Sequence, residues 1–490
     1  MEATASPGGS SYTIVTNPTT GRQFRVGEDP KALIGHGRWV PILASWACMF
    51  TAGTLEYNWG ALSGSIQAKN HWGLVAVFWM FSVYVIFESV VSHPLTGWLR
   101  DHNLLRVRYI IWIGGSIGGI VSLAITGFTG NLLVAYLGFS VLGGIGGGMI
   151  YNTCITMTAK WYPDRKGWRT GFVDGGWPYG AVPWIIAIGA LTGSAAHLSV
   201  GTVKTILVAD GIVITVVTFI AGWFMVDPPK NWWPKQVDPL NWTKYKKRST
   251  AGELAVNPPA VRQAGPRVMW RTPQAKWIGI EHCLFVGASL FGVAFVYPFG
   301  QAMGLGAAAV IAGAIGFDLL DGFGRTFYGW MSEIFGRRPT MVATYIAQAV
   351  FLMLTYWMGL IHQPVLFAIC AFLAGSVAGT GFAMAPLLVA DYYGENYNAI
   401  NYATIYSWKA LGGSFAGGLA AIIMTGNVLS NGTPNWFRGF VFGAILVVLA
   451  ALVLGFLVKQ PTLEQITKAE EGAAAAAARR AKKRGQPVGT

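Results

Sequence analysis

The stretch "GRTFYGWMSE" at residues 324–333 decides the fold, because the chain contains a second copy of its pattern. The earlier copy reads "SHPLTGWLRD" at residues 92–101, so the offset is 232 residues and Asp101 matches Glu333. The same offset relates two further stretches, namely "GGIGGG" at 143–148 and "GSVAGT" at 375–380. The sequence therefore predicts an internal duplication, in which each half repeats the same set of elements.

The composition predicts that both halves lie in a membrane. Of the 490 residues, 53% are hydrophobic and only 11% are charged, whereas a soluble domain carries about 25% charged residues. Apolar segments of about 20 residues, long enough to cross a bilayer as helices, recur along the chain. We predict an all-α polytopic membrane protein with twelve transmembrane helices in a six-plus-six pseudo-symmetric arrangement. The predicted spans are about 39–63, 73–98, 108–128, 131–158, 169–193, 203–226, 276–299, 303–331, 339–361, 364–390, 398–424 and 436–458.

The duplication and the spans divide the chain into five predicted parts. Two six-helix bundles are joined by a linker rich in Pro, Trp and Lys, and polar segments flank them. The parts are an N-terminal segment (1–38), the first bundle (39–226), the linker (227–275), the second bundle (276–458) and a basic tail (459–490). Such repeats place a substrate site near the bilayer midplane, between the halves.

The basic residues predict the orientation. If the N-terminus is cytoplasmic, thirty of the 35 Lys and Arg residues lie in cytoplasmic segments and three in external loops. Cytoplasmic loops are enriched in Lys and Arg, so we expect both termini inside. The net charge of +14 then follows from topology and contact with the lipid bilayer, and it needs no nucleic acid.

Several other classes of protein are not indicated. The four cysteines lie in apolar runs without CxxC spacing, which argues against disulfides and against a metal site. The glycine run at 143–148 lacks the Lys-Ser/Thr of a phosphate loop. Because we find no nucleophile–base constellation and no cofactor loop, we expect neither an enzyme nor a cofactor. The polar first 38 residues argue against a cleavable signal peptide. We also expect the protein to be a monomer.

Two basic residues, Arg325 and Lys409, remain within the predicted spans. Arg325 lies eight residues before Glu333, about 12 Å inside the membrane boundary, and Lys409 lies eleven residues after Asn398, about 16 Å inside. A charge at that depth costs roughly 2.5–3.5 kcal/mol, so each needs a compensating partner. We expect that partner to be a small anionic substrate in a water-filled cavity, since a guanidinium and an ammonium together neutralise a dianion.

An internal salt bridge is the alternative for both cations. Asp318 and Asp321 precede Arg325 by seven and four residues, on about the same helix face. No acidic residue lies within ten residues of Lys409, so its partner must come from another helix. The candidate partners of Lys409 are Glu56, Glu88, Asp174, Asp210 and Glu281.

Polar and aromatic residues complete the predicted site. His93 stands where the repeat places the counterpart of Arg325, and it is either a proton carrier or a histidine hydrogen-bonded between helices. Aromatic side chains wall small cavities and Tyr hydroxyls donate to anions, although packing and interface belts use the same residues. The aromatic candidates for substrate binding are Tyr57, Tyr151, Tyr179, Tyr328, Tyr406 and Trp408.

The loops after the two repeat copies resemble the signature G-x-x-x-[DE]-…-R of the major facilitator superfamily. They read "GWLRDHNLLRVR" and "GWMSEIFGRR". A carboxylate at a helix end that pairs with basic residues of the next segment holds one conformation until the halves move, whereas a plain basic loop only sets topology. The predicted gating residues are Asp101, Glu333, Arg337 and Arg338.

Three motifs resemble the oxalate:formate antiporter family within that superfamily. They are "YNW" at 57–59, "GFGRTFYGWMSE" at 322–333 and "YSWKALGG" at 406–413. The resemblance implies the major facilitator fold and the exchange of oxalate entering for formate leaving, which moves one net negative charge inwards. It also implies a dicarboxylate bound by an Arg and a Lys inside an aromatic box, here Arg325, Lys409, Tyr57, Tyr151, Tyr179 and Tyr406. The linker also resembles that of bacterial members, which implies a location in the cytoplasmic (inner) membrane of a bacterium.

One departure from the family concerns the tenth span. The stretch reads "GSVAGTGFAMAP", with Phe382 as its only aromatic residue, whereas better-known members bring several aromatics there, including a Trp. The box is then wider or the substrate is different. Two other functions stay open: a proton-coupled monocarboxylate symporter, in which Glu56 serves proton coupling, and a non-transporting membrane sensor.

Overall fold

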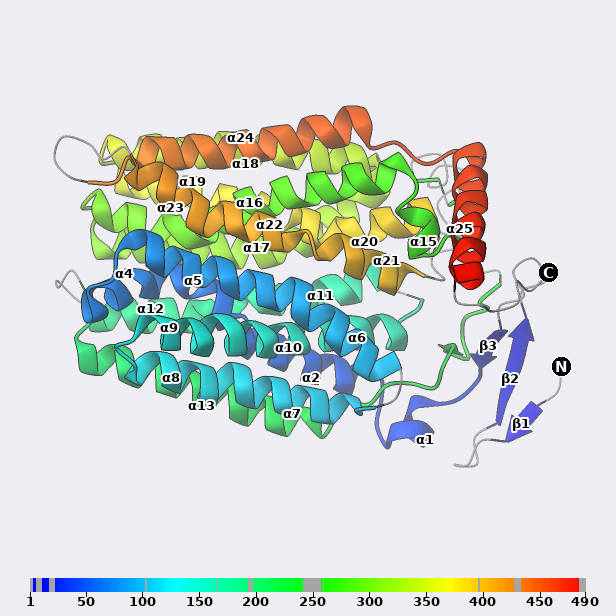
Figure 1. Ribbon diagram of the computed structural model, residues 1–490. Coiled ribbons are helices and arrows are strands. Elements are labelled where there is room, and N and C mark those ends of the chain that lie inside the picture. Colours follow the sequence, from blue (N-terminus) through cyan, green and yellow to red (C-terminus); the bar gives the residue numbers. More distant parts are fainter. Residues whose placement is uncertain are drawn as a thin grey trace.

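The computed structural model describes residues 3–5, 11–16, 23–101, 104–164, 166–192, 197–240, 257–258, 260–394, 397–426 and 433–483. Long helices run side by side along one direction, and the helices before the linker lie together on one side of those that follow it (Figure 1). The prediction of an all-α polytopic membrane protein is confirmed in this architecture.

The first half is built from helices that are often broken into consecutive pieces, some of them π-helical. In chain order they are α1 (Pro30–Ile34), α2 (Trp39–Ala52), α3 (Thr54–Tyr57), α4 (Trp59–Asn70), α5 (Leu74–Ile86), η1 (Phe87–Ser92), α6 (His93–Asp101), α7 (Val107–Ser116), η2 (Ile117–Val121), α8 (Ser122–Phe128), α9 (Leu132–Ala135), η3 (Tyr136–Gly143), α10 (Gly144–Trp161), α11 (Lys166–Tyr179), α12 (Ala181–Thr192) and α13 (Val200–Gly222).

The second half contains more helices that run unbroken. In chain order its elements are α15 (Pro266–Met269), α16 (Pro273–Ala302), α17 (Ala307–Phe335), α18 (Arg337–Leu360), α19 (Pro364–Ala378), α20 (Thr380–Tyr393), α21 (Asn398–Tyr406), α22 (Lys409–Ser414), η4 (Phe415–Leu419), α23 (Ala420–Thr425), α24 (Trp436–Leu452), η5 (Val453–Leu457) and α25 (Leu463–Lys483).

Nine of the described helices are long and apolar enough to cross a membrane. The other three predicted spans, 39–63, 169–193 and 398–424, correspond to the interrupted helices α2–α4, α11–α12 and α21–α23. The count of twelve spans therefore stays a prediction. Interrupted helices are where secondary transporters commonly form their substrate sites, so the interruptions indicate where to look for the site.

A glycine permits the close crossing of two of these interrupted helices. A Cβ atom on Gly53, at the break between α2 and α3, would lie 1.8 Å from the carbonyl oxygen of Trp177 in α11. Real Cβ atoms do not approach a backbone oxygen so closely, so only glycine allows this contact. The crossing brings the short helix α3 against α11 inside the first half.

A four-stranded sheet, which the sequence analysis did not predict, lies beyond one end of the helices together with α25 (Figure 1). Its strands are β1 (Ala3–Ala5), β2 (Ser11–Thr16), β3 (Gln23–Val26) and β4 (Trp232–Trp233), in the order β1-β2-β3-β4. The first two pairings are antiparallel and the third is parallel. Because β4 belongs to the predicted linker, the sheet ties the N-terminal segment to it. We call this end of the bundle the linker end.

Ion pairs reinforce the linker end of the first half. Arg100 donates to both carboxylate oxygens of Asp227, at 2.8 and 2.9 Å, and Lys160 lies 3.0 Å from the same carboxylate. Burial alone would raise the pKa of Asp227, but the two cations outweigh it and lower the pKa below its ordinary value. Arg38 binds Asp164 through two nitrogens, with Nη1 donating to Oδ1 at 2.8 Å and Nη2 donating to Oδ2 at 3.2 Å.

Candidate functional site

Two cations and four carboxylates meet between the two halves of the protein. Every one of these side chains is buried, with at most 6% of its surface exposed. We call them the central cluster, which consists of Arg325, Lys409, Glu56, Glu88, Asp174 and Asp321.

Arg325 of α17 holds two carboxylates. Its Nη1 lies 2.9 Å from Oδ2 of Asp174 in α11, and its Nε donates to Oδ1 of Asp321 at 3.1 Å. Its Nη2 donates to the Tyr57 hydroxyl at 2.8 Å, and that hydroxyl donates to Asp321 at 2.6 Å. The Tyr151 hydroxyl donates to Asp174 at 2.7 Å. Each of these two carboxylates thus receives one cation and one tyrosine hydroxyl.

Lys409, the first residue of α22, holds the other two carboxylates. Its Nζ lies 3.0 Å from Oε1 of Glu56 in α3 and 3.0 Å from Oε2 of Glu88 in η1. The indole Nε1 of Trp177 donates to Glu56 at 2.8 Å, and the Tyr406 hydroxyl donates to Glu88 at 3.0 Å. The pattern of one cation and one aromatic donor for each carboxylate is therefore repeated.

Glycines bring the opposing helices close enough for these contacts. A Cβ on Gly175 would lie 3.0 Å from the carbonyl oxygen of Gly322, so α11 and α17 cross almost backbone to backbone, one residue from Asp174. A Cβ on Gly413 would lie 2.5 Å from a methyl group of Val85. That second crossing sets α22 against α5, one turn from the contact between Lys409 and the π-helix η1. π-helical turns recur at functional sites.

The charges of the central cluster are unequal. Four carboxylates surround two cations, so the formal charge is −2 when all six groups are ionised. Buried charges are tolerated when they are paired and hydrogen-bonded, and each carboxylate here meets both conditions. The aromatic donors that the sequence analysis assigned to a substrate anion thus bind carboxylates, but these belong to the protein itself.

The expectation that neither cation has a protein partner is wrong for this conformation. The internal salt bridge, which the sequence left open as the alternative, is present at both cations. Among the suggested partners, Asp210 accepts a hydrogen bond from Thr54 instead. Glu281 accepts one from Tyr345. Within the described residues no ion pair of Asp318 is found.

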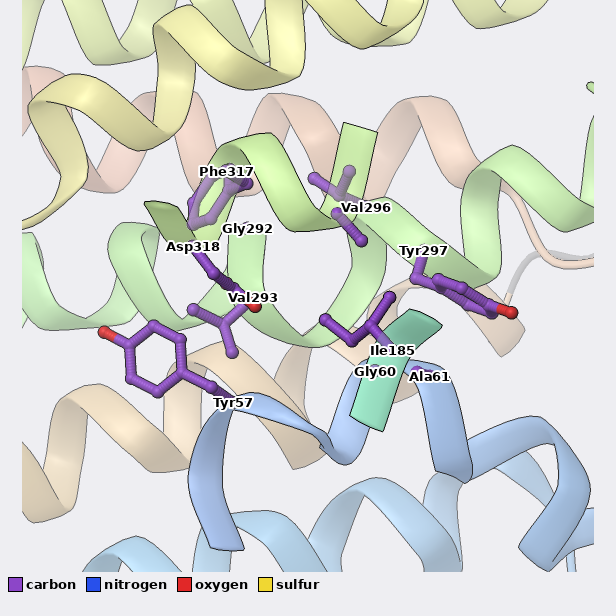
Figure 2. Close-up of a pocket in the computed structure, with 11 residues that line it drawn as sticks. Tyr57, Gly60, Ala61, Ile185, Gly292, Val293, Val296, Tyr297, Phe317 and Asp318 are labelled. Carbon is purple, nitrogen blue, oxygen red and sulfur yellow. The ribbon is translucent and has the colours of Figure 1, made fainter. Parts of the chain in front are cut away.

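Asp318 instead lines a narrow cavity beside the cluster, where the two halves meet (Figure 2). The cavity has a volume of about 10 Å³, roughly the room that one water molecule needs. It lies between α3, α4 and α12 of the first half and α16 and α17 of the second. Its lining residues are Tyr57, Gly60, Ala61, Ile185, Gly292, Val293, Val296, Tyr297, Ala314, Phe317 and Asp318.

The structure brings some predicted aromatic residues into the site and not others. Tyr57, Tyr151 and Tyr406 contact the central cluster directly, as described above. The ring of Tyr179 packs on Gly322, beside the crossing of α11 and α17. Tyr328 packs against Phe327, and Trp408 stacks on Trp270 with ring centroids 6.2 Å apart. No contact of Tyr328 or Trp408 with the cluster is found among the described residues, and their binding role stays a prediction.

His93 lies behind the cluster. Its ring stacks on Tyr406 with centroids 4.4 Å apart, and its Nδ1 donates to the backbone carbonyl of Glu88 at 2.9 Å. Glu88 precedes His93 by five residues in the same continuous helix, Leu74–Arg100, so this hydrogen bond lies within one helix and is not the bond between helices that the sequence left open. The contact holds the Tyr406 hydroxyl and the π-helical turn in place. A proton-carrying role for His93 stays a prediction.

Two residues of the second half add to the site. The ring of Phe382 in α20 lies 4.9 Å from the guanidinium carbon of Arg325 and 5.8 Å from Nζ of Lys409, so both cations lie against one aromatic ring. His282 in α16, which the sequence analysis missed, is buried with its ring centroid 6.1 Å from that of Tyr406. Neither ring nitrogen of His282 has a hydrogen-bond partner within the described chain. Its only signal in the sequence is the pair "EH" at 281–282 in an apolar run.

The predicted gating residues lie at the linker end. Arg337 forms an ion pair with Asp391 of α20, and Arg338 donates to the carbonyl oxygens of Leu454 and Gly455. Glu333 lies near Arg337 at the end of α17, within electrostatic range. The side chain of Asp101 lies outside the described residues. A gating role for these four residues stays a prediction.

Buried ionisable groups between two helical bundles are typical of a secondary transporter. The family model for the Major Facilitator Superfamily matches residues 44–320 and 285–488, so the chain belongs to this superfamily. It is 25% identical over 448 residues to the oxalate:formate antiporter of Oxalobacter formigenes, an alignment that covers 91% of this chain and 95% of that one. It is 22% identical over 378 residues to the uncharacterised MFS-type transporter YhjX of Escherichia coli K12, covering 76% and 85%.

Solved structures support the same fold. A D-xylose–proton symporter superposes with a TM-score of 0.62 at 12% identity, over 86% of this chain and 97% of that chain. The xylose transporter XylE of E. coli superposes with a TM-score of 0.61 at 13% identity, over 87% and 98%. At such identities the likeness concerns the fold alone. The resemblance to an oxalate:formate antiporter is confirmed, and the chain is a transporter and not an enzyme.

Proposed function

We propose that this chain carries small carboxylate anions across the membrane by alternating access, with Arg325 and Lys409 as the anion site. One observation carries the proposal: both cations hold carboxylates, assisted by tyrosine hydroxyls, in the middle of the interface between the halves. A substrate carboxylate can take the place of a side-chain carboxylate at the same donors. Because both cations lie against the ring of Phe382, they belong to one site.

Oxalate in exchange for formate is the first substrate pair to test. It is the pair named for the relative from Oxalobacter formigenes, and a dicarboxylate suits two neighbouring cations. Proton-coupled symport of a small carboxylate is the second candidate. The four carboxylates favour it, since adding an anion to a cluster of formal charge −2 is unfavourable unless protons enter with it.

The test is counterflow in proteoliposomes. Vesicles loaded with formate or oxalate should take up labelled oxalate, and Arg325→Gln and Lys409→Gln should lower the rate by at least tenfold. Arg438→Gln and Lys459→Gln, which change exposed basic residues outside the cluster, are matched controls and should keep the rate. The proposal fails if the wild type moves no carboxylate from a panel of small mono- and dicarboxylates, or if both cluster variants transport normally.

We further propose that the linker end faces the cytoplasm of a bacterium and that the carrier works as a monomer. The excess of basic residues in the segments at this end supports the orientation. Labelling of a Leu104→Cys variant, an exposed position between α6 and α7, should occur only in inside-out vesicles. Labelling in right-side-out vesicles would reverse the orientation.

A further inference from the structure

We infer that the two halves have different functions at the central cluster: the second half binds the substrate anion, and the first half carries the protons that are transported with it. The proton carriers are Glu56, Glu88 and Asp174, and the anion site is Arg325 with Lys409. The inference rests on the proposed transport of a carboxylate, and it adds the coupling ion and the residues that bear it.

The distribution of charges between the halves supports this division. Three of the four carboxylates come from first-half elements, namely α3, η1 and α11, and both cations come from α17 and α22 in the second half. The fourth carboxylate, Asp321, precedes Arg325 by four residues on the same helix and binds it there. With all groups ionised, the first half therefore contributes −3 to the cluster and the second half +1.

The ion pairs that cross the interface cannot survive a separation of the halves. They join Arg325 to Asp174 at 2.9 Å, and Lys409 to Glu56 and Glu88 at 3.0 Å each. Alternating access moves one half against the other around the site. A buried carboxylate that loses its cation becomes neutral by taking up a proton, because an unpaired buried charge is far more costly. The cations in turn need an anion, which the substrate supplies.

No other described group facing these carboxylates can replace the cations. The groups are aromatic hydroxyls and an indole, the neighbouring carboxylates of the cluster, and the buried His93, which already donates to a backbone carbonyl. His282 packs against the rings of Phe382 and Tyr406, and no contact between it and a cluster carboxylate is found among the described residues. Neutral donors bind a carboxylate in either protonation state, so they position these side chains without fixing their charge. The groups other than carboxylates are Tyr57, Tyr84, His93, Tyr151, Trp177, Tyr402 and Tyr406.

The division also predicts the stoichiometry. An oxalate that takes both cations releases three first-half carboxylates. Asp174 then takes up one proton, and Glu56 and Glu88, which both lie 3.0 Å from Nζ of Lys409, share a second, so each substrate charge is matched by one proton. A dianion such as oxalate moves with two protons and a monoanion with one, so transport carries no net charge. Exchange of oxalate for formate without protons would instead carry one net negative charge in each cycle.

The first experiment measures charge and protons in wild-type proteoliposomes. A pH-sensitive dye inside the vesicles reports protons, and valinomycin with potassium sets the voltage. We expect an acid exterior to drive oxalate accumulation, with two protons entering per oxalate and no response to the voltage. Oxalate transport that follows the voltage and moves no protons would overturn the inference while leaving the proposed function intact. A complete absence of oxalate transport would contradict the proposed function itself.

The second experiment separates the two halves of the cluster. Asp174→Asn, Glu56→Gln and Glu88→Gln should each lower proton-driven oxalate accumulation at least tenfold while retaining oxalate-for-oxalate counterflow, which needs no proton release. Asp210→Asn, a buried carboxylate outside the cluster, is the matched control and should keep both activities. Unchanged accumulation in all three cluster variants would contradict the inference. Loss of counterflow in all three would contradict it as well, because the carboxylates would then belong to the anion site.

A third measurement needs no variant. Oxalate binding to the purified wild type, followed by tryptophan fluorescence, should weaken as the pH rises, by up to about tenfold per pH unit for each proton taken up. An affinity that is independent of pH near neutrality would show that no proton binds with the anion.

Discussion

The crossing of α11 and α17 gives a prediction that depends only on packing. In a Gly322→Ala variant the new Cβ would lie 2.5 Å from the ring of Tyr179 and 2.8 Å from the carbonyl oxygen of Gly175. The ring can swing aside, but the backbone oxygen can move only with its helix. The two helices belong to opposite halves, so the alanine should push the halves apart next to the ion pair between Asp174 and Arg325.

The expected magnitude follows from the cost of overpacking. An extra methyl group in a close-packed contact costs about 1–3 kcal/mol, which shifts an equilibrium between two conformations by about 5–150-fold. The described conformation has the crossing closed, so the variant should favour conformations in which it is open. The ion pair at 2.9 Å should be lost along with the crossing.

Spin-label distances between the halves measure this shift. Labels on Leu104→Cys and Ile400→Cys, two exposed positions that flank the linker end of opposite halves, report whether that end opens. Gly329→Ala is the matched control on the same helix, since a Cβ there meets nothing within 4 Å. A distance distribution in Gly322→Ala that equals those of the wild type and of the control would refute the packing argument.

Three further predictions concern single side chains. Tyr151→Phe leaves Asp174 without its aromatic donor, so the melting temperature in detergent should fall by an amount that corresponds to roughly 1–3 kcal/mol; an unchanged melting temperature would contradict it. Trp408→Phe should change the KM for oxalate less than twofold, because Trp408 stacks on Trp270 away from the cluster, and a larger change would place it at the substrate. The lowered pKa of Asp227 stabilises the fold at neutral pH, and this contribution should be lost as the pH falls from about 3.9 through the lower folded-state value. In thermal unfolding against pH, Asp227→Asn should be less stable than the wild type at neutral pH and approach it in acid, whereas a constant difference would contradict the pairing.

The class of fold could be predicted from the sequence because it depends on local properties. Apolar segments of membrane length must be helical, since every backbone group in lipid has to be hydrogen-bonded within its own segment. The offset of 232 residues between the repeat copies indicated the duplication without any contact information. The small sheet at the linker end could not be predicted, because it joins a polar N-terminal segment to Trp232 and Trp233 more than 200 residues away.

The candidate site could be predicted only in part. The two cations could be identified because a charge at mid-membrane depth is costly whatever the tertiary fold. The predicted residues Tyr57, Tyr151 and Tyr406 also contact the cluster. Trp408 was expected to join Tyr406, but the helix is interrupted between α21 and α22, and the two side chains face different surroundings. Helical periodicity does not predict which face a residue presents after such an interruption.

The sequence by itself determined that two positive charges lie deep in a duplicated helical membrane protein and that each needs a counter-charge. Only the tertiary structure decided what supplies it here: Glu56 reaches Lys409 across 353 residues of chain, and Asp174 reaches Arg325 across the interface between the halves. The physical reason is that a buried cation needs a counter-charge because it loses its solvation, and this loss can be predicted from the composition of the segment and from the depth of the residue in the membrane. The choice of partner depends on where helices distant in the chain cross, and at the crossing of α11 with α17 the glycines Gly175 and Gly322 set that distance.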